Sequence, residues 1–318
     1  MKMEAKKKNI TKTKILLFKF SCLISLLLLY LIFRQFRNNE IKVCLCSPGK
    51  NENRYIKEFV EHYKNYGVDK IFLYDNNDLD GEFFEQVINN YIQDKFVKII
   101  NFRGKKRAAL DMMNDCYRNN FKVFDWLIFF EIDEYIFLKD IYNIKTFLSD
   151  NKFLKCERIQ LNWVFHTDNN LLYYENRTLK ERFPEIEENA KKNINIPHGI
   201  KSILRGHIPN IKINCIHTLN HRLKSCDGFG NYKSVKGIVT LQSDYRNFYI
   251  DHYNFKSTEE FIKKINVGDI MYYKDNQLQR IKVYFLINKF TEEKIKLMEK
   301  VTGLNLSEIR IRFMKMKK

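Results

Sequence analysis

Apolar and polar positions follow two different periods along the first half of the chain. Short apolar runs of strand character lie at 41–46, 70–74, 96–101 and 126–130. Between them, apolar residues recur at helical spacing over about 52–66, 82–91 and 106–119. The run at 126–130 is apolar on both faces, which is typical of a fully buried strand. This β-α-β-α-β-α-β order predicts a mainly parallel, doubly wound α/β sheet.

The first of these helices carries clear signals at both ends. Asn51 stands where an N-terminal cap belongs, and Gly67 stands where a left-handed stop belongs. One apolar face consists of Tyr55, Ile56, Phe59, Val60 and Tyr63. The pattern therefore predicts an amphipathic helix packed on the sheet.

Polar residues follow three of the predicted strands at their carboxyl ends. Asn51, Asp75 and Glu131 each come directly after such a strand or its turn. Ligands of open α/β sheets bind outside the carboxyl ends of the strands. The sequence therefore predicts a ligand site at this edge of the sheet.

The most informative chemistry lies in Glu131-Ile132-Asp133-Glu134. In extended chain the carboxylates of Glu131 and Asp133 point to the same side, with Glu134 an unassigned neighbour. Two such carboxylates suit Mg²⁺ or Mn²⁺, which takes its remaining ligands from water and substrate phosphates. The alternative is a solvated turn, because acid-x-acid triplets are common. Delivery by a buried strand to the ligand-binding edge favours a metal site.

The C-terminal third predicts mixed structure. Strands are expected at about 212–218 and 236–249, and helices at 259–267, 277–289 and 306–316. Gly268 is placed to end the first of these helices. Cys215 and Cys226 flank a polar loop that contains glycine, so we expect a disulfide between them.

Composition is consistent with a folded domain. The chain of 318 residues is 45% hydrophobic and 14% aromatic, and its 4 Pro and 11 Gly form no linker-like run. Its net charge of +18 is uneven, because residues 1–42 hold 10 Lys and Arg against 2 acids. No basic stretch is interleaved with stacking aromatics, which argues against nucleic acid as a partner. A solvated lysine surface explains most of the remainder, and a diphosphate substrate is compatible with it.

A membrane anchor is expected near the N-terminus. Residues 15–33 are apolar apart from Lys19, which can extend its ammonium to the headgroups. The excess of lysine ahead of this run predicts a cytoplasmic tail at 1–14, a short stem at 34–40 and a lumenal domain at 41–318. The alternative is a cleaved signal peptide, but no small-x-small site precedes Arg34. We expect the protein to lie in the membrane of the Golgi or endoplasmic reticulum, or in the inner membrane if the cell is bacterial.

Six cysteines follow the predicted anchor. An even number suits an oxidising lumen with disulfides. Zinc is the alternative, but no Cys-x-x-Cys or His-x-x-x-His spacing completes a ligand set.

The chain resembles the family 92 glycosyltransferases, which are related to family 2 and have the GT-A fold. The resemblance covers about 41–270. Within the domain at 41–318 we expect a nucleotide-sugar half at about 41–140, an acceptor half at about 141–275 and C-terminal helices at about 276–318. The motifs that carry it are Asn51-Glu52-Asn53-Arg54-Tyr55, Tyr74-Asp75-Asn76, Asp125-Trp126, Glu131-Ile132-Asp133-Glu134, Asn162-Trp163, Lys201-Ser202-Ile203 and His252-Tyr253 with Phe255-Lys256-Ser257.

This resemblance implies transfer of a sugar from a nucleotide-sugar, a UDP-sugar, to a glycan acceptor. Inversion at the anomeric carbon and a Mn²⁺ or Mg²⁺ cofactor are also implied. Glu131 and Asp133 correspond to the family's metal-binding acids, although Asp is more usual at the first position. The longer arm of Glu131 can shift its contact with the metal to one through water.

The resemblance also implies roles for five further residues. His252 is expected to complete the metal ligands, although a histidine beside a tyrosine can equally be a hydrogen-bonded structural residue. Lys256 and Lys201 are expected near the diphosphate, with an exposed surface position as the alternative for Lys201. Glu52 and Asp75 are expected to line the nucleoside pocket, although Glu52 can instead stabilise its own helix N-terminus.

The chain departs from the family pattern after Trp163, where it continues Phe165-His166-Thr167-Asp168. An inverting transferase needs a carboxylate to remove the proton of the acceptor hydroxyl, and Asp168 is our candidate. The competing acids are Glu134, Glu175, Glu181 and Asp251. The rival from another class is an inactive sugar-binding protein of the same fold, against which the intact Glu131, Asp133 and His252 argue.

Overall fold

The structure is a computed structural model that describes Ser25 and residues 40–188, 198–220, 222–232, 239–240, 245–267 and 276–315. The chain divides into two units, Met1–Ile41 and Lys42–Lys318. The predicted membrane span at 15–33 lies outside the described residues apart from Ser25, so it stays a prediction. None of the helices among the described residues is long and apolar enough to cross a membrane.

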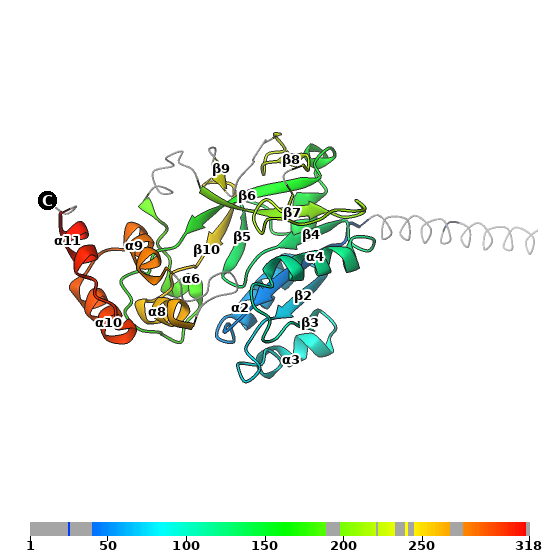
Figure 1. The fold of residues 1–318 in the computed structure, drawn as a ribbon. Coiled ribbons are helices and arrows are strands. Elements are labelled where there is room, and N and C mark those ends of the chain that lie inside the picture. The colour runs from blue at the N-terminus through cyan, green and yellow to red at the C-terminus, as the bar shows by residue number, and fades with distance from the viewer. Residues whose placement is uncertain are drawn as a thin grey trace, which may run out of the picture. The chain divides into compact units, whose positions relative to one another are not determined.

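The first half of the second unit confirms the predicted alternation of strands and helices (Figure 1). Its elements are β1 (Val43–Gly49), α2 (Ile56–Asn65), β2 (Lys70–Asp75), α3 (Glu85–Gln93), β3 (Val97–Asn101), α4 (Ala109–Asn120) and β4 (Trp126–Phe129). The strands lie in the order β3-β2-β1-β4 and pair in parallel.

The strand order determines where the helices lie. Because crossovers between parallel strands are right-handed, α2 and α3 belong on one face of the sheet and α4 on the other. The predicted doubly wound arrangement is therefore present in this half. The order changes direction between β1 and β4, and their carboxyl ends form the point where such sheets bind ligands.

The second half continues the same sheet with mixed strand directions. Its elements are β5 (Glu134–Leu138), α5 (Ile144–Leu148), a 3-10 turn (Asn151–Phe153), β6 (Arg158–Phe165), α6 (Leu179–Arg182), β7 (His198–Arg205), β8 (Ser225–Cys226), β9 (Val239–Thr240) and β10 (Phe248–His252). Beyond β4 the order is β7-β6-β10-β5. β7 is antiparallel to β4 and β6, and β10 is antiparallel to β5 but parallel to β6.

The strand predicted at 212–218 is wrong. This segment contains turns and one isolated bridge between Cys215 and Leu219. Ile213, Ile216 and Leu219 all pack into one hydrophobic cluster with α4. Their spacing of three residues suits a turn that buries every third side chain, whereas a strand buries every second one.

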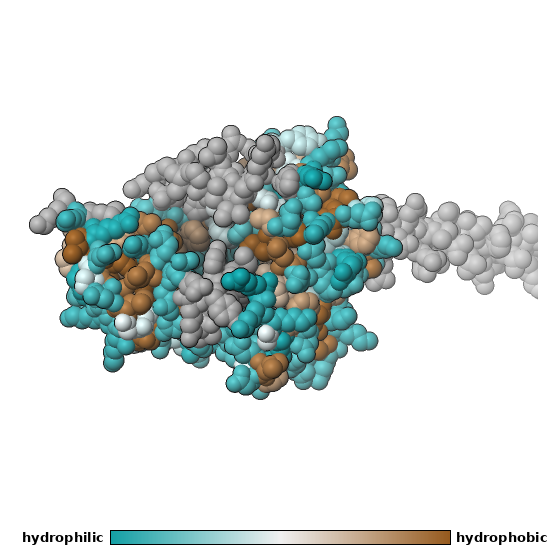
Figure 2. Space-filling view, viewed as in Figure 1, coloured by the Kyte–Doolittle hydropathy of each residue, from teal (hydrophilic) through white to brown (hydrophobic). Residues whose placement is uncertain are grey.

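Four helices close the described chain: α8 (Thr258–Val267), α9 (Gln277–Ile287), α10 (Glu292–Thr302) and α11 (Ser307–Lys315). They share a hydrophobic cluster that includes Ile265, Tyr284, Met298 and Phe313. Hydrophobic residues also gather on the outside of α9 and α11, as Figure 2 shows. The sequence reading missed α10, although Thr291 caps its start and Gly303 ends it in a left-handed conformation. Gly268 lies outside the described residues.

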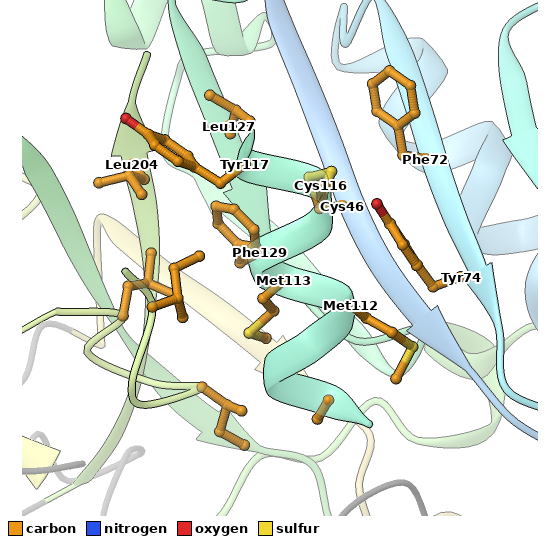
Figure 3. Packing of buried hydrophobic residues seen from close by; sticks show 14 of the residues in the cluster. Cys46, Phe72, Tyr74, Met112, Met113, Cys116, Tyr117, Leu127, Phe129 and Leu204 are labelled. Atoms are coloured by element: carbon orange, nitrogen blue, oxygen red, sulfur yellow. A yellow bond between two sulfur atoms is a disulfide. The ribbon is translucent and has the colours of Figure 1, made fainter. Parts of the chain in front are cut away.

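The expected Cys215–Cys226 disulfide is wrong. The disulfides are Cys46–Cys116, which joins β1 to α4 within the cluster of Figure 3, and Cys156–Cys226. The short strand β8 pairs with β6 at Ile159, and this pairing brings Cys226 to the chain that enters β6, where Cys156 lies. Cys215 and Cys44 have free thiols.

Candidate active site

Two acidic segments meet at the point where the strand order reverses. Glu52 follows β1, and Glu131 and Asp133 follow β4. The two segments pack closely, because a Cβ added to Gly49 would come within 2.6 Å of the side chain of Ile132. The predicted edge of the sheet therefore does collect the candidate residues.

Glu131 and Glu134 share one buried lysine. Lys201 lies on β7, the antiparallel neighbour of β4. Its Nζ is 2.6 Å from Glu131 Oε1 and 3.4 Å from Glu134 Oε1. The side chains of Lys201 and Glu134 are fully buried, whereas that of Glu131 is 30% exposed. The exposed surface position considered for Lys201 is wrong, because Lys201 is an internal counter-ion here, and its expected contact with phosphate stays a prediction.

The surroundings of Glu134 are dry and structured. Its Oε1 accepts a hydrogen bond from Trp163 Nε1 at 2.9 Å, and its Oε2 accepts one from the backbone N–H of Glu131 at 2.9 Å. Burial raises the pKa of Glu134 to about 8, with Lys201 opposing the shift. Burial alone would lower the pKa of Lys201, but Glu131 and Glu134 together raise it. Lys201 is therefore charged, and it holds the turn at 131–134 in place.

Asp133 has a different lysine as its partner. Lys264 of α8 donates to Asp133 Oδ2 at 2.9 Å and to Asn254 Oδ1 at 2.8 Å. Asp133 Oδ1 is buried and has no hydrogen-bond partner among the described residues, and His252 Nε2 lies 3.7 Å from it. Burial would raise the pKa of Asp133, but Lys264, His252 and Lys256 lower it well below its usual range. Asp133 is thus an anion with one oxygen still available.

His252 is held beside Asp133 by aromatic rings. It ends β10 opposite Glu134, and its ring lies 4.5 Å from that of Trp163 and 5.2 Å from that of Phe165. Burial lowers the pKa of His252 to about 3, so the imidazole is neutral at pH 7. Its Nδ1 is also buried without a hydrogen-bond partner among the described residues. A neutral imidazole is the form that binds a metal.

The expected metal ligands therefore come together only in part. Within the part of the chain that the structure describes, no three His, Cys, Asp or Glu side chains come close enough together to hold a metal ion. Asp133 and His252 lie side by side with unsatisfied atoms, while Glu131 is paired with Lys201. Two protein ligands still fit Mg²⁺ or Mn²⁺, because these ions often complete their coordination with water and phosphate oxygens.

Glu52 and Lys256 form a second ion pair at this edge. Lys256 Nζ is 3.1 Å from Glu52 Oε2 and lies 3.8 Å from the centre of the Tyr55 ring. Burial raises the pKa of Glu52, while Lys256 lowers it, Asp133 raises it and Lys264 lowers it. The backbone of Lys256 is left-handed, with a φ of 53°, which is uncommon for a side chain of this size. Strained residues of this kind cluster at functional sites.

Asp75 is committed to its own loop. Its Oδ2 accepts from Arg103 Nη1 at 2.7 Å, and its Oδ1 accepts from the backbone and side chain of Asn77. Arg103 also donates to the backbone carbonyls of Asp78, Gly81 and Glu82. Asp75 therefore shapes the loop after β2, and both of its carboxylate oxygens already have protein partners.

Asp168 lies in a setting that argues against the expected role of base. Its Oδ2 is 2.5 Å from Lys294 Nζ of α10 and accepts from the Tyr284 hydroxyl of α9, and its Oδ1 accepts from Asn170. Its side chain is 2% exposed. A base must reach an acceptor hydroxyl, whereas this carboxylate ties the loop after β6 to the C-terminal helices.

The acids that competed with Asp168 have partners as well. Glu175 pairs with Arg177, Glu181 caps α6 through Thr178, and Asp251 accepts from His166 Nε2 at 2.7 Å.

The sequence reading missed Lys264. A glutamate at 260 and a lysine at 264 have the spacing of a pair on a helix surface. In the structure, however, Glu260 pairs with Arg182 and accepts from Tyr55, and Lys264 reaches Asp133 instead. No local sequence pattern distinguishes a Glu260–Lys264 pair on the helix surface from the contact of Lys264 with Asp133.

Sequence comparison gives the family of this chain. Residues 39–301 match the sequence model of glycosyltransferase family 92. The chain belongs to glycosyltransferase family 92. A family 92 protein of Ricinus communis is 24% identical over 231 residues, which are 70% of this chain and 37% of that protein. One of Oryza sativa subsp. japonica is 24% identical over 112 residues, or 32% of this chain and 17% of that protein. The chain thus spans well under half the length of these relatives.

Solved structures show only distant likeness. The S. aureus TarS fragment 1-349 in complex with UDP-GlcNAc is 14% identical, with a TM-score of 0.39 over 84% of this chain and 73% of that one. A mannosyltransferase from Pyrobaculum calidifontis, solved with GDP-Man and Mn²⁺, is 10% identical, with a TM-score of 0.31 over 38% of this chain and 35% of that one.

Proposed function

We propose that this chain transfers a sugar from a nucleotide-sugar, a UDP-sugar, to a glycan or glycoconjugate acceptor with inversion at the anomeric carbon. Membership of family 92 supports the reaction class. The observation that carries the proposal is the pair Asp133 and His252 at the reversal of the strand order. Both are buried, Asp133 Oδ1 has no hydrogen-bond partner among the described residues, and His252 Nε2 faces it at 3.7 Å.

The residues suggest a division of roles. Asp133 and His252 would hold Mn²⁺ or Mg²⁺, and Glu131 stands beside them, fixed by Lys201. When bound, the metal balances negative charge on the departing diphosphate. Lys256 lies at the same edge and provides a further positive charge for that diphosphate. The acceptor oxygen forms the new bond to the anomeric carbon as the bond to the diphosphate breaks; the nucleoside diphosphate leaves with the electron pair of that bond, and the proton of the acceptor hydroxyl passes to the solvent.

Asp75 and Glu52 serve the nucleoside end in this proposal. Asp75 contributes by fixing, together with Arg103, the conformation of the loop after β2. Glu52 contributes from the segment that directly follows β1. This arrangement keeps the nucleoside near β1 and β2 and leaves the mixed half of the sheet for the acceptor.

We also propose that the domain works in the lumen of the Golgi or endoplasmic reticulum, anchored by 15–33, or on the inner membrane if the cell is bacterial. Two disulfides support an oxidising compartment.

The direct test uses the full chain in detergent with a panel of nucleotide-sugars, with and without Mn²⁺, and measures donor binding and nucleotide release. We expect metal-dependent binding of one donor, and its loss in Asp133→Asn. A donor that binds without turnover on any glycan acceptor would favour the rival, an inactive sugar-binding protein. The observation that favours this rival is that Glu131 and Asp133 are each paired with a lysine. Absence of donor binding would exclude both.

A further inference from the structure

The lysine that holds Asp133 stands where it conflicts with a metal ion. Lys264 Nζ is 2.9 Å from Asp133 Oδ2, and Asp133 is the best-placed acid for the proposed metal. A dication bound to this carboxylate would lie close to an ammonium group, and like charges at such distances repel strongly. Lys264 and the metal therefore compete for Asp133.

Lys264 is also the lysine whose side chain is able to move away from its carboxylate partner. Its side chain is 21% exposed, whereas that of Lys201 is fully buried between two carboxylates. Lys264 stands near the end of α8, and a long flexible side chain can turn without moving the helix. Its second acceptor, Asn254 Oδ1 at 2.8 Å, is uncharged and can keep the ammonium nearby.

The two ion pairs at this edge balance in charge. Glu52 pairs with Lys256, and Asp133 pairs with Lys264, so these four groups sum to zero. A dication alone would disturb this balance, whereas a dication together with a diphosphate of two negative charges restores it. The diphosphate also gives a displaced ammonium new oxygen acceptors.

We propose that Lys264 is a counter-ion that holds Asp133 until metal and donor arrive, and then moves to the donor's diphosphate oxygens. This inference rests on the proposed function. It makes the binding of metal and donor mutually dependent, because the donor removes the cation that opposes the metal. By linkage, the metal strengthens donor binding by the same factor.

The test measures Mn²⁺ binding to the full chain in detergent by titration calorimetry, with and without UDP. Lys264→Met removes the competing charge. Lys263→Met is the matched control, because Lys263 is the adjacent residue on α8, is 54% exposed and lies 4.0 Å from Glu82 rather than at Asp133. Lys264→Arg keeps the charge. Lys264→Gln serves the same purpose as Lys264→Met if the Met variant does not fold.

We expect Lys264→Met to bind Mn²⁺ alone about tenfold more tightly than the natural chain. The factor by which UDP tightens Mn²⁺ binding should shrink about as much. Lys263→Met and Lys264→Arg should resemble the natural chain in both measurements. Equal Mn²⁺ affinities in Lys264→Met and Lys263→Met would overturn the inference while leaving the proposed function intact. No Mn²⁺ binding by any variant, with or without UDP, would overturn both.

Discussion

Lys201 and Glu134 are both fully buried, and Lys201 Nζ lies 3.4 Å from Glu134 Oε1. The same ammonium holds Glu131 at 2.6 Å. One lysine therefore serves two acidic side chains on either side of Asp133: it offsets the charge of Glu131, and burial keeps Glu134 largely protonated at pH 7 by raising its pKa to about 8. The buried Lys201 therefore has fixed partners, whereas the partly exposed Lys264 beside Asp133 is able to exchange its partner.

Removing this lysine should destabilise the protein. Lys201→Met removes the cation from the partly exposed Glu131 carboxylate and from the buried Glu134, whose pKa of about 8 leaves it largely protonated at pH 7. We expect a loss at the low end of the range of about 3–5 kcal/mol that breaking a buried ion pair costs. Denaturant unfolding measures the loss. Lys212→Met is the control, because Lys212 is exposed. Adding Glu131→Gln to Lys201→Met should restore part of the stability, because Glu131 is the carboxylate that loses its cation. A Lys201→Met variant as stable as the control would contradict this account of the pair.

The Cys156–Cys226 disulfide should contribute strongly to stability. It closes a segment of 70 residues, and loop-closure entropy for that length corresponds to about 4 kcal/mol. We expect Cys156→Ser to lower the free energy of unfolding by about this amount. Cys215→Ser is the matched control, because the Cys215 thiol is free, and it should change stability little. Peptide mapping without reductant checks the pairing, and a bridge that contains Cys215 would refute it.

The sequence predicts the first half of the fold well because its elements are specified locally. The α2 helix, for example, has an apolar face of Ile56, Phe59, Val60 and Tyr63, which are all buried. Strand direction alone places Glu52 after β1 and Glu131 after β4 at the same edge of the sheet, and the ligand site expected there stays a prediction. Local patterning fails at 212–218, where the apolar residues Ile213, Ile216 and Leu219 are buried at a spacing of three rather than at the alternation of a strand.

The charge partners in the site were not predictable in the same way. Lys201 is 70 residues from Glu131, and Lys264 is 131 residues from Asp133. These pairings follow from the antiparallel placement of β7 beside β4 and from the position of α8, which are properties of the completed fold. The sequence therefore indicates which acids gather but not which lysine each acid meets. Cys226 shows the same limitation, because its partner is set by the pairing of β8 with β6.

His62 should make stability depend on pH. Burial lowers its pKa to about 4 from an ordinary 6.5, and its Nε2 is buried without a hydrogen-bond partner among the described residues. The unfolded chain therefore binds a proton between pH 6.5 and 4 that the folded chain does not. The free energy of unfolding should fall by about 1–3 kcal/mol as pH drops through this range.

The His62→Phe variant isolates this contribution, because phenylalanine keeps an aromatic ring and does not titrate. Denaturant unfolding of both proteins at several pH values between 7 and 4 gives the two slopes. We expect a shallower slope for the variant, whatever its stability at pH 7. Parallel curves would show that His62 titrates alike in the folded and unfolded chains.

Asp168 should prove essential for stability but not for donor binding. Asp168→Asn leaves Lys294, whose side chain is 1% exposed, without its anionic partner, and we expect a loss of about 3–5 kcal/mol. Adding Lys294→Met should recover much of this loss, because replacing both members of a buried pair is far less costly than replacing one. In the folded double variant, donor affinity should match that of the natural chain. If the double variant regains stability and binds donor normally but transfers no sugar, Asp168 takes part in the reaction after all, and its ion pair with Lys294 must open when the acceptor binds.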